Sequence, residues 1–187
     1  MRRLVPLVAA LALACPPAIG GADDVLSIRG IRPGMTVAAA RNAPGPGVRA
    51  RGEKEGVYRW EWRGRVDLPG NPEVTLRFEA PRDGDEARVS RVVLVADRPG
   101  PVAREWREEL AHRWGPPVAP LVDLRDPRSG YPVEGTVWRR GETVAVLVVA
   151  KEGTPRGIAV RRIALFLLPG FDPVALTRRL YREIRGR

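Results

Sequence analysis

Residues 57–63 read VYRWEWR, and this stretch decides the class of fold. Aromatic and charged side chains alternate along it, in the order Tyr58, Arg59, Trp60, Glu61, Trp62 and Arg63. In an extended chain, successive side chains point to opposite sides, so the aromatic residues share one side and the charged residues the other. This pattern predicts a strand of an antiparallel sheet with one buried face and one wet face.

Further strands are predicted on both sides of the middle of the chain. Residues 73–80, EVTLRFEA, repeat the alternation of apolar and polar side chains. Residues 88–96, 142–150 and 157–168 are richer in β-branched residues, which favours more central strands. Short turns containing Gly, Pro or Asp separate these segments, and such turns are typical of antiparallel connections.

Two helices are predicted from apolar spacing and capping residues. Residues 101–114 place an apolar side chain at every fourth position, and the Gly-Pro-Pro run that follows ends the helix. The apolar residues are Val102, Trp106, Leu110 and Trp114. Residues 172–185 begin with Asp172 as N-cap and Pro173 in the first turn, which predicts a C-terminal helix.

The order of these elements predicts an α+β domain over residues 23–187, with an antiparallel sheet and helices on one face. Two halves, residues 28–100 and 101–187, have the same order of parts, which suggests a tandem helix-plus-three-strand repeat. In the first half, the helix starts near residue 36, the loop covers 43–56, and the strands start near 57, 73 and 88. In the second half, the helix starts near residue 102, the loop covers 115–135, and the strands start near 136, 142 and 157.

The first 22 residues have the features of a signal peptide. Two arginines precede an apolar run that is too short to span a bilayer, and small residues end the segment at Ala22. The chain is therefore expected to work outside the cytoplasm, in the periplasm or as a secreted protein. Cys15 is an alternative lipid-attachment site, although the residues around it depart from the usual motif.

The charge of the chain favours anionic partners. Its formal net charge is +10, and removal of Arg2 and Arg3 with the leader still leaves a basic domain. Export argues against nucleic acid as the partner. The expected partner is another envelope protein or an anionic envelope surface, including peripheral association with a membrane. The alternative is that the charge only keeps the domain soluble.

The sequence is poor in catalytic residues. His112 is the single histidine, and it lies away from the apolar stripe of its helix. Ser27, Ser90 and Ser129 stand outside any nucleophile motif. No metal site or cofactor is expected, because the chain has one Cys and one His. We therefore expect a binding or scaffold protein without enzymatic activity.

Carboxylates leave one enzymatic alternative open. Asp123 and Asp126 flank a charged loop and could serve a hydrolase acting on cell-wall polymer. Asp83, Asp85 and Glu86 could offer oxygens to calcium, but their spacing fits an Asp-Gly hairpin turn better than a calcium loop.

Tyr58, Trp60 and Trp62 are the candidate partner-binding aromatics, together with the neighbouring Arg59 and Arg63. Aromatic side chains concentrate binding energy at interfaces. The alternative is that the three aromatics are the core face of their strand, with the arginines on an outer, anion-attracting surface.

Residues 30–36, GIRPGMT, predict the entrance to a helix with Thr36 as N-cap. Together with the later HRWGPP at residues 112–117, this motif resembles small bacterial envelope domains of the SmpA/OmlA lipoprotein and β-lactamase-inhibitor-protein type. The resemblance implies a fold of helices on a sheet and a role in binding proteins, with no catalytic residues to transfer.

Mass spectrometry of the chain exported by a bacterial host tests the leader. We expect Asp23 at the N-terminus of the processed chain, because Ala22 ends the run of small residues that a signal peptidase requires. A chain that begins at Cys15 and carries the added mass of acyl groups would establish the lipid anchor instead.

Overall fold

The computed structural model describes residues 26–125 and 130–170, without the side chains of residues 119–125 and 132. The described residues form one antiparallel sheet and two short helices, α1 (Val37–Asn42) and α2 (Ala103–Trp114). The strands are β1 (Arg49–Lys54), β2 (Val57–Arg65), β3 (Glu73–Ala80), β4 (Arg91–Asp97), β5 (Ala119–Arg125), β6 (Pro132–Arg140), β7 (Thr143–Thr154) and β8 (Gly157–Pro169).

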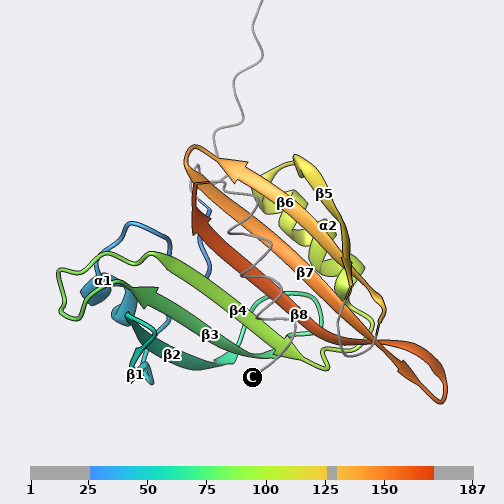
Figure 1. Ribbon diagram of the computed structural model, residues 1–187, viewed down its shortest axis with the longest axis horizontal. Coiled ribbons are helices and arrows are strands. Elements are labelled where there is room, and N and C mark those ends of the chain that lie inside the picture. Colours follow the sequence, from blue (N-terminus) through green and yellow to red (C-terminus); the bar gives the residue numbers. More distant parts are fainter. Residues whose placement is uncertain (1–25, 126–129, 171–187) are drawn as a thin grey trace, which may run out of the picture.

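The sheet has the strand order β1-β2-β3-β4-β8-β7-β6-β5, so the last strand of each half lies at its centre (Figure 1). β4 and β8 pair antiparallel from Val92 opposite Leu167 to Asp97 opposite Arg162. This pairing joins the first half, α1 to β4, to the second half, α2 to β8. The first strands of the two halves, β1 and β5, occupy the two edges.

Each half contains four strands, and the predicted helix-plus-three-strand unit is corrected accordingly. β1 lies within the loop predicted over residues 43–56, and β5 lies within the loop predicted over residues 115–135. Both are edge strands. The six residues of β1 are all exposed, so no apolar alternation marks this strand in the sequence. Pro120 lies in β5, and an edge strand is where a sheet tolerates proline.

Among the described residues, the helix content is lower than the predicted α+β fold implies. Residues 26–125 and 130–170 are mostly sheet, with two short helices, and the predicted helix over residues 172–185 falls outside them. Thr36 caps α1 as expected, because its Oγ1 accepts a hydrogen bond from the Ala39 amide at 3.3 Å. α2 covers the predicted stripe, and Trp106, Leu110 and Trp114 are buried.

The main core, called here the helix-side core, contains buried side chains from both helices and from the strands beneath them. Trp106 of α2 is fully buried, and its Nε1 donates to the Pro69 carbonyl at 3.0 Å. The indole of Trp114 packs edge-on against Trp138 of β6, with ring centroids 5.8 Å apart. These contacts of two large aromatic side chains fix α2 on the sheet.

A second group of ten buried apolar residues, the far-side cluster, lies on the opposite face of β4, β6, β7 and β8. Alternation along β4 assigns its residues to the two faces. Leu94 belongs to the helix-side core, while Val93 and Val95 belong to the far-side cluster. The central strands are therefore buried on both faces, which explains their continuous apolar sequences.

Leu94 lies at the pairing between the halves, directly opposite Leu165, and both are about 1% exposed. We expect Leu94→Ala to lower the free energy of unfolding by about 2–5 kcal/mol, because truncation leaves a cavity in a packed core. Urea denaturation measures this change. Val118→Ala, at a side chain that is 62% exposed, is the control and should shift the free energy by less than about 0.5 kcal/mol.

Candidate functional site

The two faces of β2 have different environments. Trp60 is 4% exposed and Trp62 is 7% exposed, and both belong to the helix-side core. Trp60 stacks on Phe78 of β3 with ring centroids 5.4 Å apart, and the Nε1 of Trp62 donates to the Pro46 carbonyl at 3.2 Å. Tyr58 is partly buried against the same core.

This burial corrects the prediction that the aromatic residues of β2 bind a partner. The Trp60 and Trp62 rings are covered by protein, so they are not available to stack on a ligand. The alternative interpretation, in which the aromatic residues form the core face of the strand, agrees with the structure. The charged residues of β2 consequently lie on the opposite face, which is the face that can meet a partner.

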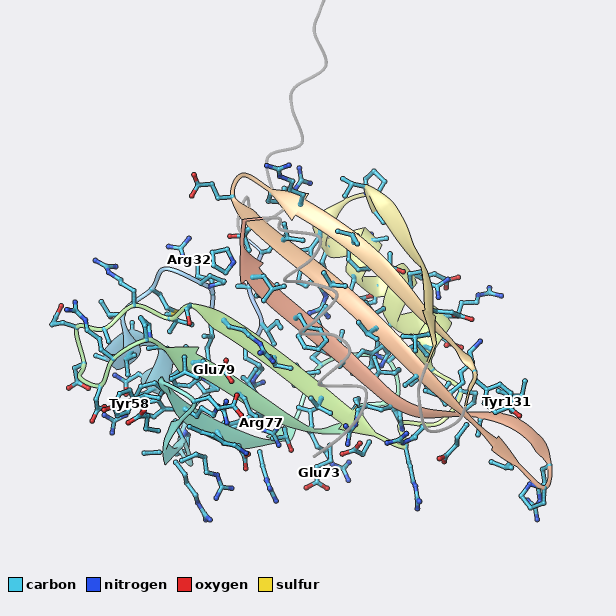
Figure 2. The ribbon with its side chains drawn as sticks, viewed as in Figure 1. Arg32, Tyr58, Glu73, Arg77, Glu79 and Tyr131 are labelled. Carbon is cyan, nitrogen blue, oxygen red and sulfur yellow. The ribbon has the colours of Figure 1, made fainter. Side chains whose placement is uncertain are left out.

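Charged residues from four strands meet on that opposite face. In the strand register, Arg59 lies opposite Glu79, which lies opposite Arg91, and Glu61 lies opposite Arg77. Figure 2 shows Arg77 and Glu79 in this half of the sheet. We call the whole set the arginine face: Arg51, Arg59, Glu61, Arg63, Arg77, Glu79 and Arg91. It has five positive and two negative side chains.

Glu61 is the centre of the more accessible part of this face. Its Oε1 accepts hydrogen bonds from Arg51 at 2.5 Å and from Arg63 at 3.0 Å, and its Oε2 accepts one from Arg77 at 3.1 Å. The carboxylate is only 7% exposed, whereas the three arginine side chains are 46%, 64% and 44% exposed. One buried anion therefore holds three partly exposed cations in place.

Burial of the Glu61 carboxyl raises its pKa, but the hydrogen bonds and positive charges of Arg51 and Arg77 lower it by more. The net result is a pKa below the ordinary carboxyl value of 4.5. Glu61 is thus ionised at neutral pH and is a poor proton donor or acceptor there. The cluster retains two positive charges in excess.

The second carboxylate of the arginine face is enclosed more tightly. Glu79 accepts a hydrogen bond from Arg59 at 3.1 Å and lies 3.6 Å from Arg91. The Arg91 guanidinium also lies 5.6 Å from the centre of the Phe166 ring. These three charged side chains are 12–17% exposed, so this part of the face is built mainly for packing.

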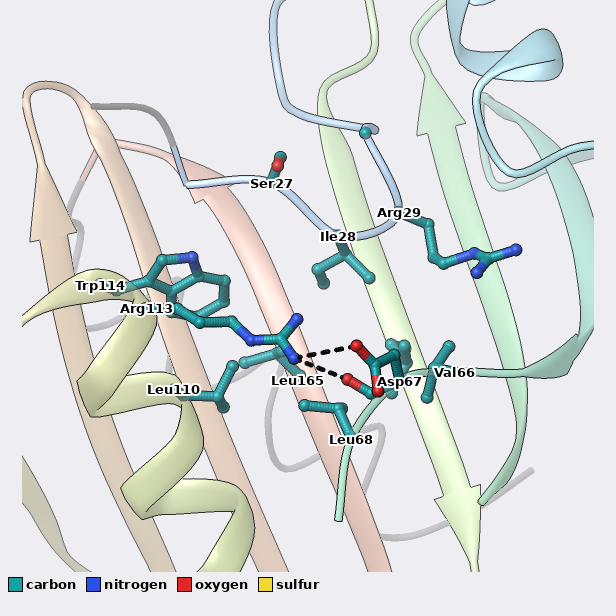
Figure 3. A pocket seen from close by; sticks show the side chains of 12 residues that line it. Ser27, Ile28, Arg29, Val66, Asp67, Leu68, Leu110, Arg113, Trp114 and Leu165 are labelled. Atoms are coloured by element: carbon teal, nitrogen blue, oxygen red, sulfur yellow. Dashed lines mark hydrogen bonds and ion pairs between the residues drawn. The ribbon is translucent and has the colours of Figure 1, made fainter. Parts of the chain in front are cut away.

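A pocket of about 360 Å³ lies between the halves, on the helix side of the sheet (Figure 3). Its lining includes Leu94 of β4, Leu165 of β8 and Trp114 of α2. Arg113 of α2 reaches across to the segment after β2, where its guanidinium donates to the Asp67 carbonyl at 2.8 Å and lies 3.6 Å from the Asp67 carboxylate.

The arginine of the pocket that contacts both halves already has partners within the chain. Arg113 also donates to Glu109 at 2.6 Å, so its single positive charge has two carboxylate partners in the same chain. Arg29 points away from the pocket (Figure 3), and its guanidinium lies 4.9 Å from the centre of the Trp62 ring. The contact between Arg113 and Asp67 ties the two halves together. We take the arginine face as the candidate site.

The remaining candidates take no part in this site. His112 is exposed on α2. Asp83 accepts a hydrogen bond from the Gly84 amide at 2.9 Å, as in a turn, and Asp85 pairs with Arg41 at 3.2 Å. The Asp123 side chain, Asp126, Ser129 and Cys15 lie outside the part of the chain that is described.

Across the described residues, no group of three or more His, Cys, Asp or Glu side chains is arranged to hold a metal ion. Within the same ranges, no helix has the length and apolar character needed to cross a membrane.

No protein-family model matches the chain, and no curated protein or solved structure matches it significantly. The resemblance to envelope domains stays a prediction, and function has to be argued from the geometry.

Five residues of the arginine face were not among the sequence candidates, namely Arg51, Glu61, Arg77, Glu79 and Arg91. Alternation along β2 and β3 places Glu61 and Arg77 on the polar sides of their strands, so part of the signal was present. Their contact depends on the β2–β3 register. Arg51 reaches Glu61 from an irregularity in β1 between Ala50 and Gly52, within a segment predicted to be a loop.

Glu61→Gln removes the negative charge at the centre of the cluster. At pH 7 we expect the free energy of unfolding to fall by about 1–2 kcal/mol, because three charge-assisted hydrogen bonds weaken. The pKa of Glu61 is lowered in the folded state, so the stabilisation is present above the ordinary value of 4.5 and is lost as the pH falls through the lower folded value.

Urea denaturation of both proteins between pH 7 and pH 3 measures this difference. It should shrink steadily below about pH 4.5. Glu53→Gln, at an exposed residue of β1, is the matched control and should leave stability nearly unchanged. If Glu61→Gln lowers the free energy of unfolding by the same amount at every pH, the lowered pKa of Glu61 is contradicted.

Proposed function

We propose that this chain is an exported, non-enzymatic binding protein that holds an acidic protein partner through its arginine face. The observation that carries the proposal is the cluster of Arg51, Arg63 and Arg77 around Glu61. Planar guanidinium groups recognise carboxylates through paired hydrogen bonds, and arginine is enriched at protein interfaces.

The Glu61 cluster lowers the cost of binding such a partner. Each arginine donates one hydrogen bond to Glu61, and a guanidinium has five N–H donors. The side chains are already ordered by the buried carboxylate, so less rotamer entropy is lost when a partner docks. Remaining donors on the exposed guanidinium groups can then meet carboxylates of the partner.

The proposed fold also supports a binding role. We propose that the two halves are copies of one helix-plus-strands unit with the helices on one face of the sheet, because both halves have the element order helix then four strands. Both helices contribute to the helix-side core, which leaves the opposite face of β1–β3 for contact. The proposed location is the periplasm or the outside of the cell, from the predicted leader.

The alternative function, a carboxylate-dependent hydrolase that uses Asp123 and Asp126, rests on the sequence alone. Neither side chain lies within the part of the chain that the structure describes. Nothing at the arginine face favours it. Arg51 and Arg77 lower the pKa of Glu61 and keep it ionised, and this makes it unsuited to donate a proton to a leaving group at neutral pH.

Charge reversal on the arginine face tests the proposal. The double variant Arg51→Glu/Arg63→Glu should lower recovery of the partner from envelope extract by at least about tenfold, because two attractive contacts become repulsive. The measurement is cross-linking followed by pull-down, with the recovered protein identified by mass spectrometry and its affinity then measured by calorimetry at two salt concentrations.

The control is Arg32→Glu/Arg82→Glu, which changes the net charge equally at two exposed arginines outside the arginine face. This control should retain recovery within about twofold, with circular dichroism showing that both variants are folded. Equal recovery by both double variants, or affinity that does not respond to salt, would overturn the proposal.

A further inference from the structure

The ends of β7 and β8 form a two-stranded ribbon that runs past the rest of the sheet (Figure 1). β4 pairs with β8 only from Arg162 onward, and β6 pairs with β7 only between Thr143 and Val149. Residues 151–160 therefore have strand partners only within the ribbon itself, and the pairing is irregular between Ala150 and Lys151. A two-stranded ribbon is marginally stable in water on its own, so this extension adds little to the stability of the sheet.

One face of the ribbon carries an exposed aliphatic side chain beside a tyrosine. Ile158 lies directly opposite Gly153 in the register, so a side chain at either position would point to the same face. The hydroxyl oxygen of Tyr131 lies 2.7 Å from the position that a Cβ atom on Gly153 would occupy. Tyr131 therefore contacts Gly153 on the face that carries Ile158, near the base of the ribbon (Figure 2).

Ile158 is 65% exposed, and it is one of two large apolar side chains that are exposed in the described residues. The other, Val118, lies just before β5 and is 62% exposed. A single exposed aliphatic side chain is common on protein surfaces. Ile158 differs because it stands beside the turn of a projecting ribbon and shares its face with a tyrosine.

Basic side chains lie on this face and beside it. Residues 150–161 contain Lys151, Arg156 and Arg161 against one acidic residue, Glu152. Arg156 is exposed in the turn, while Lys151 pairs with Glu134 of β6. An aliphatic tip, a tyrosine with a polar end and a surplus of cations together match the chemistry of a lipid headgroup boundary.

We propose that this ribbon contacts the surface of an anionic lipid bilayer. Ile158 enters the boundary between headgroups and acyl chains, Tyr131 lies at the headgroup level, and Arg156 binds lipid phosphates. The proposed site is separate from the arginine face, because it involves β7, β8 and Tyr131 in place of β1–β4.

The dimensions of the ribbon favour a lipid surface over a protein groove. A stable protein interface buries about 800 Å² on each partner around a packed apolar centre. Four residue pairs with one large exposed aliphatic side chain, Ile158, offer far less apolar area than that. A bilayer needs no complementary shape, and weak insertion adds to electrostatic attraction that the basic chain already provides.

Vesicle sedimentation tests this proposal. All variants either carry or lack the first 22 residues, so any contribution of those residues to binding is the same in each. The vesicles contain phosphatidylglycerol and phosphatidylethanolamine, or phosphatidylcholine alone. We expect binding to the anionic vesicles that weakens with added NaCl. Ile158→Glu and Arg156→Glu should each lower the partition coefficient by about tenfold.

Val118→Glu is the control for Ile158→Glu, because it places the same charge at an equally exposed apolar residue. Arg82→Glu is the control for Arg156→Glu, since Arg82 is an exposed arginine in the turn after β3. Each control should change the partition coefficient by less than about threefold. Three outcomes would overturn the proposal. A variant and its control could lose binding equally, the protein could bind both kinds of vesicle alike, or it could fail to bind anionic vesicles.

Discussion

The pairing of β4 with β8 is the constraint on which the rest of the structure depends. It makes one sheet of the two halves, and it places Leu94 and Leu165 where both halves pack. It also sets which face of each strand is covered. Because the helix-side core takes Trp60 and Trp62, the charged residues of β2 are left on the opposite face. The candidate site is thus a consequence of how the sheet is covered on its other side.

Regular periodicity explains which elements the sequence could predict. β2, β3, β7 and β8 have alternating or continuous apolar patterns, and α2 has an apolar residue at every fourth position, so each was predicted at nearly its observed position. β1 and β5 were predicted as loops. An edge strand has a partner on one side only, and all residues of β1 are exposed, so its sequence lacks the apolar signal that marks a strand.

The candidate site was predictable in part for a related physical reason. Alternation separates Arg59 and Arg63 from the tryptophans, but it does not say which of the two faces other elements will cover. Tryptophan is equally suited to a core and to an interface, so burial alone decided between them. The convergence of Arg51 and Arg77 on Glu61 depends on an irregularity in β1 and on the β2–β3 register, and neither is encoded in a local pattern.

The central position of the last strand also has a consequence for the order of folding. During synthesis the first half emerges complete with β4, whose partner β8 follows about 60 residues later. Until then β4 is an apolar edge strand with unpaired amides and carbonyls, which is the kind of edge that joins other chains. The contact that completes the sheet is therefore among the slowest to form, and a nascent chain stalled before residue 157 would be prone to aggregate.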